Sequence, residues 1–375
     1  MVTLLKLVAA CFVEWTDDIT NAHHRAAAFL DGVGPLRPEG AMVFPLIADY
    51  AVWAGCLALA RVTGMTFGIV AKAPAILADL AIAWLLLAHR AGRPAALLYI
   101  FSPVSLVLSV YHGQIHTVAV LGAVWALHQA DRGRASLAGL ALALAGSVRQ
   151  HFVALTGALA RDRRSRLAAA ATCAAVLVAV NAPVLLRPGE VAEHQRTIAP
   201  YGAWGASLLV LQTPRVLALA GWQTGRDTFA AADTMLRAYG QGLALMWIAA
   251  VAVVAWLRPH ADRWRLALVL ATGTCAVMTG IGVQYLIWAL PFYAVVAPRL
   301  GVLYSVVGGA WIVASYSASS LVAKYKVPSF TARLEMLQGS DIALTIATGL
   351  LGVATWAVCA YTAWHGMRAV LRETA

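Results

Sequence analysis

Apolar runs and short polar clusters alternate along almost the whole chain. Between Lys72 and His365 the runs are roughly 16 to 24 residues long, which is the length that an α-helix needs to cross a bilayer. Strands of a membrane barrel would give shorter segments with alternating polarity. The pattern therefore predicts an all-α fold, a polytopic transmembrane bundle of about 11–13 helices.

The expected crossings follow from these runs. In chain order they are Lys72–Ala88, Ala95–Val110, Gln114–Gln129, Leu167–Leu186, Tyr239–Leu257, Leu266–Gly282, Tyr285–Pro298, Val302–Val322 and Ile342–His365. The run from Val2 to Val13 is short for a crossing, so either the first helix is thin and tilted or the natural chain begins further upstream. The stretch Ala135–Ala160 is too long for one crossing and too short for two. We expect two short helices there, bent around Ser147–His151 and lining a cavity.

Basic clusters determine the expected orientation. They fall in the short segments between crossings, where cytoplasmic loops carry Lys and Arg. These clusters are Arg90 with Arg93, Arg132 with Arg134, Arg161 to Arg166, Arg258 with Arg263 and Arg265, Arg299, and Arg368 with Arg372. All of them stay on one side only if Pro45–Val70 does not cross. We therefore expect that segment to lie along the outer interface as a pair of helices.

These assignments predict one integral membrane domain over residues 1–375. Its extracytoplasmic parts are a long first loop with interfacial helices (about 16–70), a second segment (about 187–238, with an apolar interfacial piece near Ser207–Leu219) and a last loop (about 324–341). Composition agrees, because only 12% of the residues are charged whereas a soluble domain holds about 25%. The net charge of +11 comes from the loop clusters, which argues against nucleic-acid binding, and the five scattered cysteines predict no disulfide framework.

One stretch, Tyr111 to His116, gathers polar groups at the junction of two apolar runs. Polar side chains at such a junction are costly unless they face water or a polar ligand. We interpret the stretch as the rim of an active site at one membrane face. His112 and His116 are four residues apart and could form a zinc pair. Since no third ligand has suitable spacing, hydrogen bonding to a sugar or phosphate is favoured.

Further motifs occur in a fixed order around this stretch. They are Asp17-Asp18, Phe44-Pro45-Leu46 with Tyr50, Lys72 with Ala78-Asp79-Leu80, Ser102-Pro103, Tyr111-His112-Gly113-Gln114, Arg149, and Gln284 to Pro291. Over about residues 10–300 this order resembles the type C (GT-C) superfamily of membrane glycosyltransferases, in its bacterial polyprenyl-phosphate-hexose branch of mannosyltransferase-like enzymes. The resemblance implies a GT-C-like fold. It also implies inverting transfer of a hexose, mannose favoured, from a polyprenyl-phosphate-linked donor to an acceptor hydroxyl at the extracytoplasmic face.

The implied reaction suggests a residue for each role. A carboxylate must take the proton of the acceptor, and the candidates are Asp17 and Asp18, whose alternative roles are a helix cap and a solvated neighbour. Cations must stabilise the departing phosphate. Arg149 leads, because a charge at membrane depth is costly without an anionic partner, and a structural pair with Asp79 is its alternative.

Other residues complete the expected site. Secondary candidates for the donor phosphate are Arg196, Lys324, Lys326 and Arg333. The residues expected to contact substrate are His23, His24, Tyr111, His112, Gln114, His116, Gln284, Tyr285 and Trp288. Solvated loop charges are the alternative for the first group, and an aromatic belt is the alternative for the aromatic members of the second.

Partners and location follow from the resemblance. We expect a polyprenyl-phosphate sugar donor, a glycolipid, glycan or protein acceptor, and surrounding membrane lipids in the inner (plasma) membrane of a bacterial cell envelope. No cofactor is expected, and a metal-independent reaction is favoured because no carboxylate-rich cluster occurs beyond Asp17-Asp18. The alternative function is a multi-pass transporter or lipid flippase, which predicts inverted repeats and charges at mid-membrane. A non-catalytic scaffold is the third hypothesis.

Overall fold

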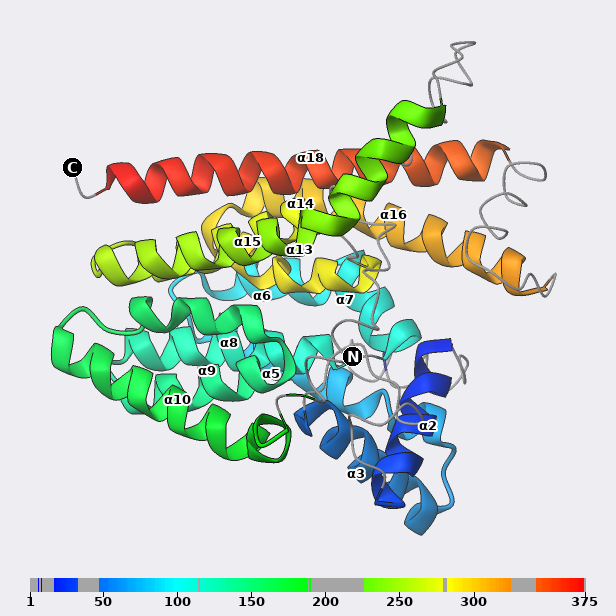
Figure 1. The fold of residues 1–375 in the computed structure, drawn as a ribbon, viewed down its shortest axis with the longest axis horizontal. Helices are drawn as coiled ribbons and strands as arrows, with labels where there is room; N and C mark the ends of the chain where they lie inside the picture. Colours follow the sequence, from blue (N-terminus) through cyan, green and yellow to red (C-terminus); the bar gives the residue numbers. More distant parts are fainter. Residues whose placement is uncertain are drawn as a thin grey trace.

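The computed structural model describes residues 6, 8, 17–32, 47–113, 115–187, 189, 226–278, 282–324 and 342–373. Within these ranges every regular element is a helix, and no strand occurs (Figure 1). The predicted all-α fold is therefore confirmed for this part of the chain. Apart from Lys6 and Val8, the first apolar run lies outside the described residues, as does the interfacial piece expected near 207–219.

The elements have the following bounds. In the first half they are α2 (Asp17–Leu30), α3 (Ile47–Thr63), α4 (Phe67–Val70), α5 (Ala73–Leu87), α6 (Gly92–Ile100), α7 (Pro103–Val107), η2 (Leu108–His112), α8 (His116–Asp131), α9 (Ala135–Val148), η3 (Gln150–Ala158) and α10 (Arg163–Leu185). In the second half they are α13 (Arg226–Leu257), α14 (Arg263–Val277), η4 (Val283–Trp288), α15 (Leu290–Val296), α16 (Pro298–Lys324) and α18 (Ile342–Arg372). The element η2 is a π-helix, whereas η3 and η4 are 3₁₀-helices.

Three helical stretches among the described residues are long and apolar enough to cross a membrane. They are Phe67–Leu87, Arg163–Leu185 and Pro298–Ser317. A fourth is the pair Gly92–Ile100 and Pro103–His112, if these two helices, bent by 49°, form one span. Shorter apolar helices occur at Ala135–Val148, Gly242–Leu257 and Val283–Val296. The chain thus has the helices of a membrane protein, in places where the apolar runs predicted crossings.

The break predicted within residues 135–160 is confirmed. Helix α9 ends at Val148, Arg149 is extended (φ −143°, ψ 102°), and the chain continues as the 3₁₀-helix η3. The N–H of Arg149 still donates to the carbonyl of Ala145 at 2.8 Å, so the break costs few backbone hydrogen bonds. A 3₁₀ segment of this kind often marks strain or a functional hinge.

The prediction of an interfacial helix pair over Pro45–Val70 is wrong in its second half. Helix α3 is present, but α4 is a single turn that continues into α5, so that Phe67–Leu87 forms one span. The physical reason is local. Gly64, with a φ of 71°, ends the first helix, whereas Ala71 and Lys72 keep right-handed helical angles and carry the chain onward.

Small residues allow α8, α9 and α10 to pack closely against each other (Figure 1). A Cβ atom on Gly122 of α8 would lie 2.9 Å from the Cβ of Ala145 on α9. A Cβ atom on Gly139 of α9 would lie 3.0 Å from the Cα of Ala169 on α10. Larger side chains would push the backbones apart, and close backbone approach is how membrane helices gain packing energy.

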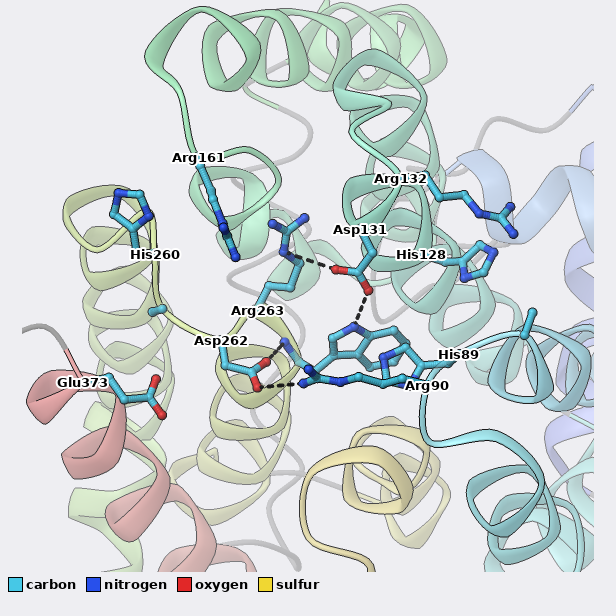
Figure 2. Close-up of a pocket in the computed structure, with 13 residues that line it drawn as sticks. His89, Arg90, His128, Asp131, Arg132, Arg161, His260, Asp262, Arg263 and Glu373 are labelled. Carbon is cyan, nitrogen blue, oxygen red and sulfur yellow. Dashed lines mark hydrogen bonds and ion pairs between the residues drawn. The ribbon is translucent and has the colours of Figure 1, made fainter.

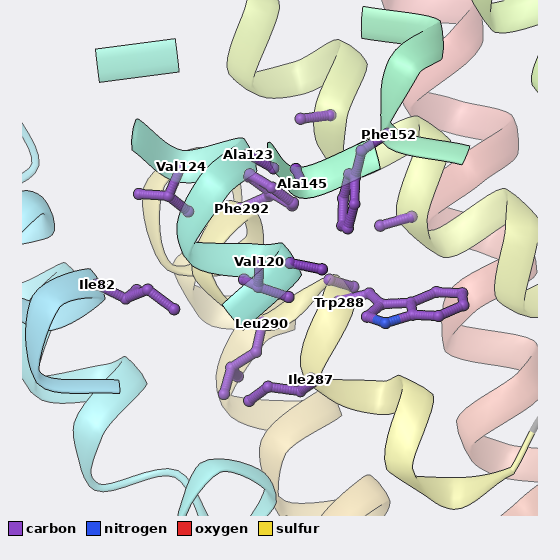
Figure 3. Packing of buried hydrophobic residues seen from close by; sticks show 14 of the residues in the cluster. Ile82, Val120, Ala123, Val124, Ala145, Phe152, Ile287, Trp288, Leu290 and Phe292 are labelled. Carbon is purple, nitrogen blue, oxygen red and sulfur yellow. The ribbon is translucent and has the colours of Figure 1, made fainter. Parts of the chain in front are cut away.

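Buried apolar side chains pack η4 against α8, and η3 against η4 and α15 (Figure 3). The ring centroid of Phe152 in η3 lies 6.4 Å from that of Trp288 in η4 and 6.5 Å from that of Phe292 in α15. Val120 and Ala123 of α8 belong to the same cluster and are fully buried. This packing brings the break at Arg149 close to the start of α8.

The bundle has two chemically different ends. Helix α8 runs from His116 to Asp131 and α9 returns from Ala135 to Val148, so His116 and Arg149 share one end, roughly 20 Å from the other. At that other end, one cavity is lined by the turn after α5, the end of α8, the turn before α10, the turn between α13 and α14, and the end of α18. We call this end of the bundle the arginine-rich end. Figure 1 shows α13 and α18 ending on this same side.

Candidate functional site

Arg149 lies at the His116 end of the bundle, in the break between α9 and η3. Its Nε donates to Nδ1 of His116 at 2.7 Å, and its Nη1 lies 3.1 Å from Oδ2 of Asp49. Nη1 also donates to the carbonyl of Val148 at 2.5 Å. The side chain is only 12% exposed. The break therefore places a largely buried guanidinium between a carboxylate and an imidazole.

Asp79, the alternative partner expected for Arg149, has other contacts. Its Oδ2 lies 2.5 Å from Nζ of Lys6, and both side chains are fully buried. Tyr99 donates to Oδ1 at 2.5 Å and Ser105 donates to Oδ2 at 3.1 Å. The predicted alternative is therefore wrong. Asp79 is held in a separate network, and Arg149 pairs with Asp49 instead.

Asp49 is a site residue that the sequence analysis did not identify. It lies in the first turn of α3 and is 6% exposed. Burial raises the pKa of its carboxyl group, and the positive charges of Arg149 and Arg25 oppose this shift. Its Oδ1 has no hydrogen-bond partner among the described residues. In the sequence, an acidic residue in the first turn of a helix is explained by its interaction with the helix dipole. The sequence therefore does not indicate that Asp49 pairs with a distant arginine.

Gly113 forms the turn between the π-helix η2 and α8. Its φ is +66°, in the left-handed region that costs other residues roughly 1–2 kcal/mol. A Cβ atom here would lie 2.7 Å from Cγ of Lys72 and 3.4 Å from Cδ1 of Ile19. The turn thus packs directly on α2 and on the start of α5, and a Cβ atom there would displace the side chain of Lys72. This packing holds His112 and His116 at the same end of the bundle as Arg149.

His112 is the last residue of the π-helix and is 1% exposed. Oη of Tyr316 lies 2.7 Å from its Nδ1, and the two rings are stacked with centroids 5.5 Å apart. The ring of Tyr111 lies 4.9 Å from that of Tyr316. Tyr316 is a second residue that sequence reasoning missed, because α16 was expected only to cross the membrane. Single π-helical turns within helices are frequent at functional sites.

Aromatic residues of η4 form one wall of this cluster. Tyr285 meets the ring of His116 edge-on, with centroids 4.7 Å apart, and lies 4.5 Å from Trp288. The ring of His151 lies 4.1 Å from that of Trp288. Trp288 is only 2% exposed, whereas residues of an aromatic belt face the membrane interface. Gln284 is partly exposed beside Tyr285.

The first helix of the described chain begins at Asp17 and Asp18, whose side chains lie outside the described part. The next residue, Ile19, is 1% exposed and packs beside Gly113. The backbone at the start of α2 is therefore a neighbour of the turn between His112 and His116. The proton-accepting role of Asp17 or Asp18 stays a prediction.

The two histidines of α2 have different environments. The ring of His23 packs 5.1 Å from that of Phe67, whereas His24 is exposed. Burial, together with the charges of His24 and Arg61, lowers the pKa of His23, which favours the neutral imidazole. A neutral imidazole can both donate and accept a hydrogen bond, as contact with a sugar hydroxyl would require.

Several predicted site residues fall outside the described part of the chain. They are Gln114, Arg196, Lys326 and Arg333, and also the side chain of Lys324 at the end of α16. Within the described residues there is no group of three or more His, Cys, Asp or Glu side chains that could hold a metal ion. Among the described residues, therefore, no third metal ligand of these residue types accompanies His112 and His116.

No protein-family model matches this sequence, and no curated protein matches it significantly. What the site can do must be judged from its own residues. His151 and Trp288 each have a buried ring nitrogen without a hydrogen-bond partner in the described part of the molecule, as has one oxygen of Asp49. Such groups need partners such as a polar ligand or water. Together with the guanidinium of Arg149, they suit a ligand that carries both hydroxyl groups and an anionic group.

Proposed function

We propose that this protein is an inverting membrane glycosyltransferase that takes a hexose, with mannose favoured, from a polyprenyl-phosphate-linked donor. The observation that carries the proposal is the position of Arg149, a largely buried guanidinium in a helix break beside Asp49 and His116. A guanidinium stabilises phosphate oxygens through its positive charge and charge-assisted hydrogen bonds. The resemblance of the sequence to GT-C enzymes supplies the class of reaction.

The proposed reaction is a single displacement. The oxygen of the acceptor hydroxyl attacks the anomeric carbon, the bond from that carbon to the phosphate oxygen breaks, and polyprenyl phosphate leaves. Asp17 or Asp18 takes the hydroxyl proton. Arg149 stabilises the negative charge that grows on the leaving phosphate. Attack from the side opposite the leaving group inverts the anomeric configuration.

The other residues of the cluster bind and orient the donor and acceptor. His112, held by Tyr316, and His116, held by Arg149, present imidazoles at the turn after η2. Tyr285 and Trp288 provide an aromatic surface next to them. Fixed neighbours of this kind keep the anomeric carbon and the attacking oxygen in line, which is a large part of catalysis of group transfer.

The proposed orientation has the arginine-rich end in the cytoplasm and Arg149 at the extracytoplasmic face. Loops rich in Lys and Arg remain in the cytoplasm during membrane insertion. The turns at the arginine-rich end contain Arg90, Arg132, Arg161 and Arg263. The cluster around Arg149 lies at the opposite end, which supports transfer at the outer leaflet of the inner membrane.

The test is a transfer assay with the purified protein in proteoliposomes that contain polyprenyl-phosphate mannose. Asp17→Asn and Asp18→Asn are compared with Asp31→Asn, which changes an exposed carboxylate at the other end of α2. We expect one of the first two variants to lose most of the transfer activity, by about 100-fold or more, and the control to retain it. Full activity in both variants refutes the assigned base, and no transfer by the wild type with any hexose donor refutes the proposal.

One observation favours the transporter or flippase as a second candidate function. The buried pair of Lys6 and Asp79 puts an ion pair on the candidate span Phe67–Leu87, which carries Asp79, and charges at membrane depth are typical of ion-coupled transporters. Vesicles that contain the protein and a labelled lipid-linked sugar distinguish the two functions. Movement of the label between leaflets without any acceptor supports the flippase, whereas label that moves to an acceptor supports the transferase.

A further inference from the structure

A second group of polar residues lies at the arginine-rich end, roughly 20 Å from Arg149 along α8 and α9. It surrounds a cavity of about 460 Å³ (Figure 2). Four arginines and three carboxylates line this cavity, and none of them belongs to the cluster around Arg149. The question is which of these charges are already compensated within the protein.

Asp131 is one carboxylate that is already bound. Its Oδ2 accepts a hydrogen bond from Nε1 of Trp264 at 2.8 Å, and its Oδ1 lies 3.5 Å from Nε of Arg263. Figure 2 marks the contacts of Asp131 with dashed lines. Asp131 therefore engages the Nε edge of Arg263 and leaves the far edge of that guanidinium to other partners.

The remaining carboxylates are bound as well. Asp262 is the N-cap of α14, where its Oδ1 accepts from the backbone N–H of Trp264 and of Arg265, and its Oδ2 lies 3.7 Å from Nη2 of Arg90. Glu373 forms an ion pair with Arg265. Each carboxylate of the cavity thus has a cation or an N–H group as its partner.

Among the described residues, these pairings leave Arg132 and Arg161 without a carboxylate, and they leave the far edge of Arg263 unused. Nη1 of Arg263 is buried and has no hydrogen-bond partner among the described residues, and no ion pair of Arg161 is found among them either. The two guanidinium groups point toward each other in Figure 2, and the charge of Arg161 acts against that of Arg263. Because Arg263 is largely buried, its repulsion by Arg161 is weakly screened, and an anion between the two groups would offset it.

We infer that this cavity binds a phosphate group between Arg161 and Arg263. Arginine favours phosphate because its planar guanidinium donates two hydrogen bonds to two phosphate oxygens. The phosphate belongs either to the head group of an anionic phospholipid or to free inorganic phosphate. Both sources fit a cavity at the ends of membrane helices, where basic pockets bind anionic head groups, and its volume exceeds that of phosphate alone.

The experiment measures the thermal unfolding of the full-length protein in neutral detergent. One series adds sodium phosphate, with sodium chloride of equal ionic strength as its control. A second series adds phosphatidylglycerol to the micelles, with phosphatidylcholine as its control. An anion that binds the folded state raises the unfolding temperature in proportion to the logarithm of its concentration. A rise with inorganic phosphate identifies the free anion as the ligand, and a rise with phosphatidylglycerol alone identifies the lipid head group.

Two variants localise the effect. Arg161→Gln removes an exposed arginine of the cavity, so we expect this variant to fold. Arg263→Gln is less suitable because it also breaks the contact with Asp131. Arg93→Gln is the matched control, an exposed arginine outside the cavity that removes the same charge. We expect Arg161→Gln to require at least tenfold more of the anion for the same rise, and Arg93→Gln to behave as wild type. An equal response of both variants, or no rise above the chloride and phosphatidylcholine controls, overturns the inference.

Discussion

Nη1 of Arg149 lies 3.1 Å from Oδ2 of Asp49, although the two residues are 100 positions apart in the chain. Their side chains are 12% and 9% exposed, so the pair is largely out of water. Removing one member of such a pair leaves an uncompensated charge, which is costly. In the proposed reaction Asp49 keeps the guanidinium in the position where it meets the donor phosphate. Asp49 is thus a positioning residue.

The first prediction concerns the coupling between these two residues. We expect Arg149→Gln to lower kcat/KM for the lipid-linked donor by about 100-fold, as is typical for loss of a group that stabilises transition-state charge. Asp49→Asn alone should lower it by about tenfold, because the guanidinium loses its orientation. Since Asp49 acts through Arg149, the double variant should be no worse than Arg149→Gln.

Initial transfer rates over a range of donor concentrations check this prediction. Asp162→Asn is the matched control, because it changes an exposed aspartate that caps α10 near the arginine-rich end. The control should keep the wild-type kcat/KM. If the losses in the double variant multiply, Asp49 acts on the reaction directly, as a proton acceptor in its own right, and the positioning role is wrong.

A second prediction compares two glycines that both have positive φ. Gly113 (φ 66°) packs against Lys72 and Ile19, whereas a Cβ atom on Gly133 (φ 72°) would meet nothing within 4 Å. Alanine at either position pays the left-handed backbone cost of roughly 1–2 kcal/mol. Only Gly113→Ala also displaces the turn that carries His112 and His116. We expect both variants to lose similar stability, and only Gly113→Ala to lose transfer activity by at least tenfold.

Thermal unfolding and transfer rates, measured on the same preparations, separate the two effects. Equal activity of the two variants would mean that the side chain of Lys72 moves aside and that the turn at Gly113 does not position the site. A much larger loss of stability in Gly113→Ala would show that the contact is chiefly structural.

The third prediction concerns the buried network around Asp79. Lys6→Met leaves the carboxylate of Asp79 without its cation, and we expect the unfolding free energy to fall by about 3–5 kcal/mol. Adding Asp79→Asn removes the orphaned charge, while the amide oxygen, at the position of Oδ1, still accepts from Tyr99. The double variant should therefore be more stable than Lys6→Met alone.

Denaturant unfolding in detergent measures this difference. If the double variant is less stable than Lys6→Met, the two groups contribute independently, and the description of the network as one compensated pair fails. If transfer by the stable double variant matches wild type, the pair is structural. If transfer is lost while stability is kept, the pair takes part in function, as the transporter hypothesis requires.

The sequence predicted the parts of this molecule that depend on length and local polarity. The break at Arg149 could be predicted, because residues 135–160 suit neither one crossing nor two. The convergence of His112, His116 and Arg149 was likewise predicted, since their positions lie at the same ends of successive antiparallel runs.

Other features could not be read from the sequence because they depend on how helices meet in space. Asp49 and Asp79 are both acidic residues in apolar helices, and no spacing tells which of them pairs with Arg149. The answer depends on the packing of α3 against the break and of Lys6 against α5. The junction after Val70 was mispredicted for a local reason. Neither Ala71 nor Lys72 is a helix-breaking residue, so nothing separates α4 from α5.

The most direct test of the proposed function is an experimental density map of the full-length protein with bound polyprenyl phosphate. The proposal predicts a phosphate within about 3 Å of the guanidinium of Arg149, beside His116 and facing the start of α2 where Asp17 and Asp18 lie. A map with well-ordered lipid phosphate elsewhere and none at Arg149 would contradict it.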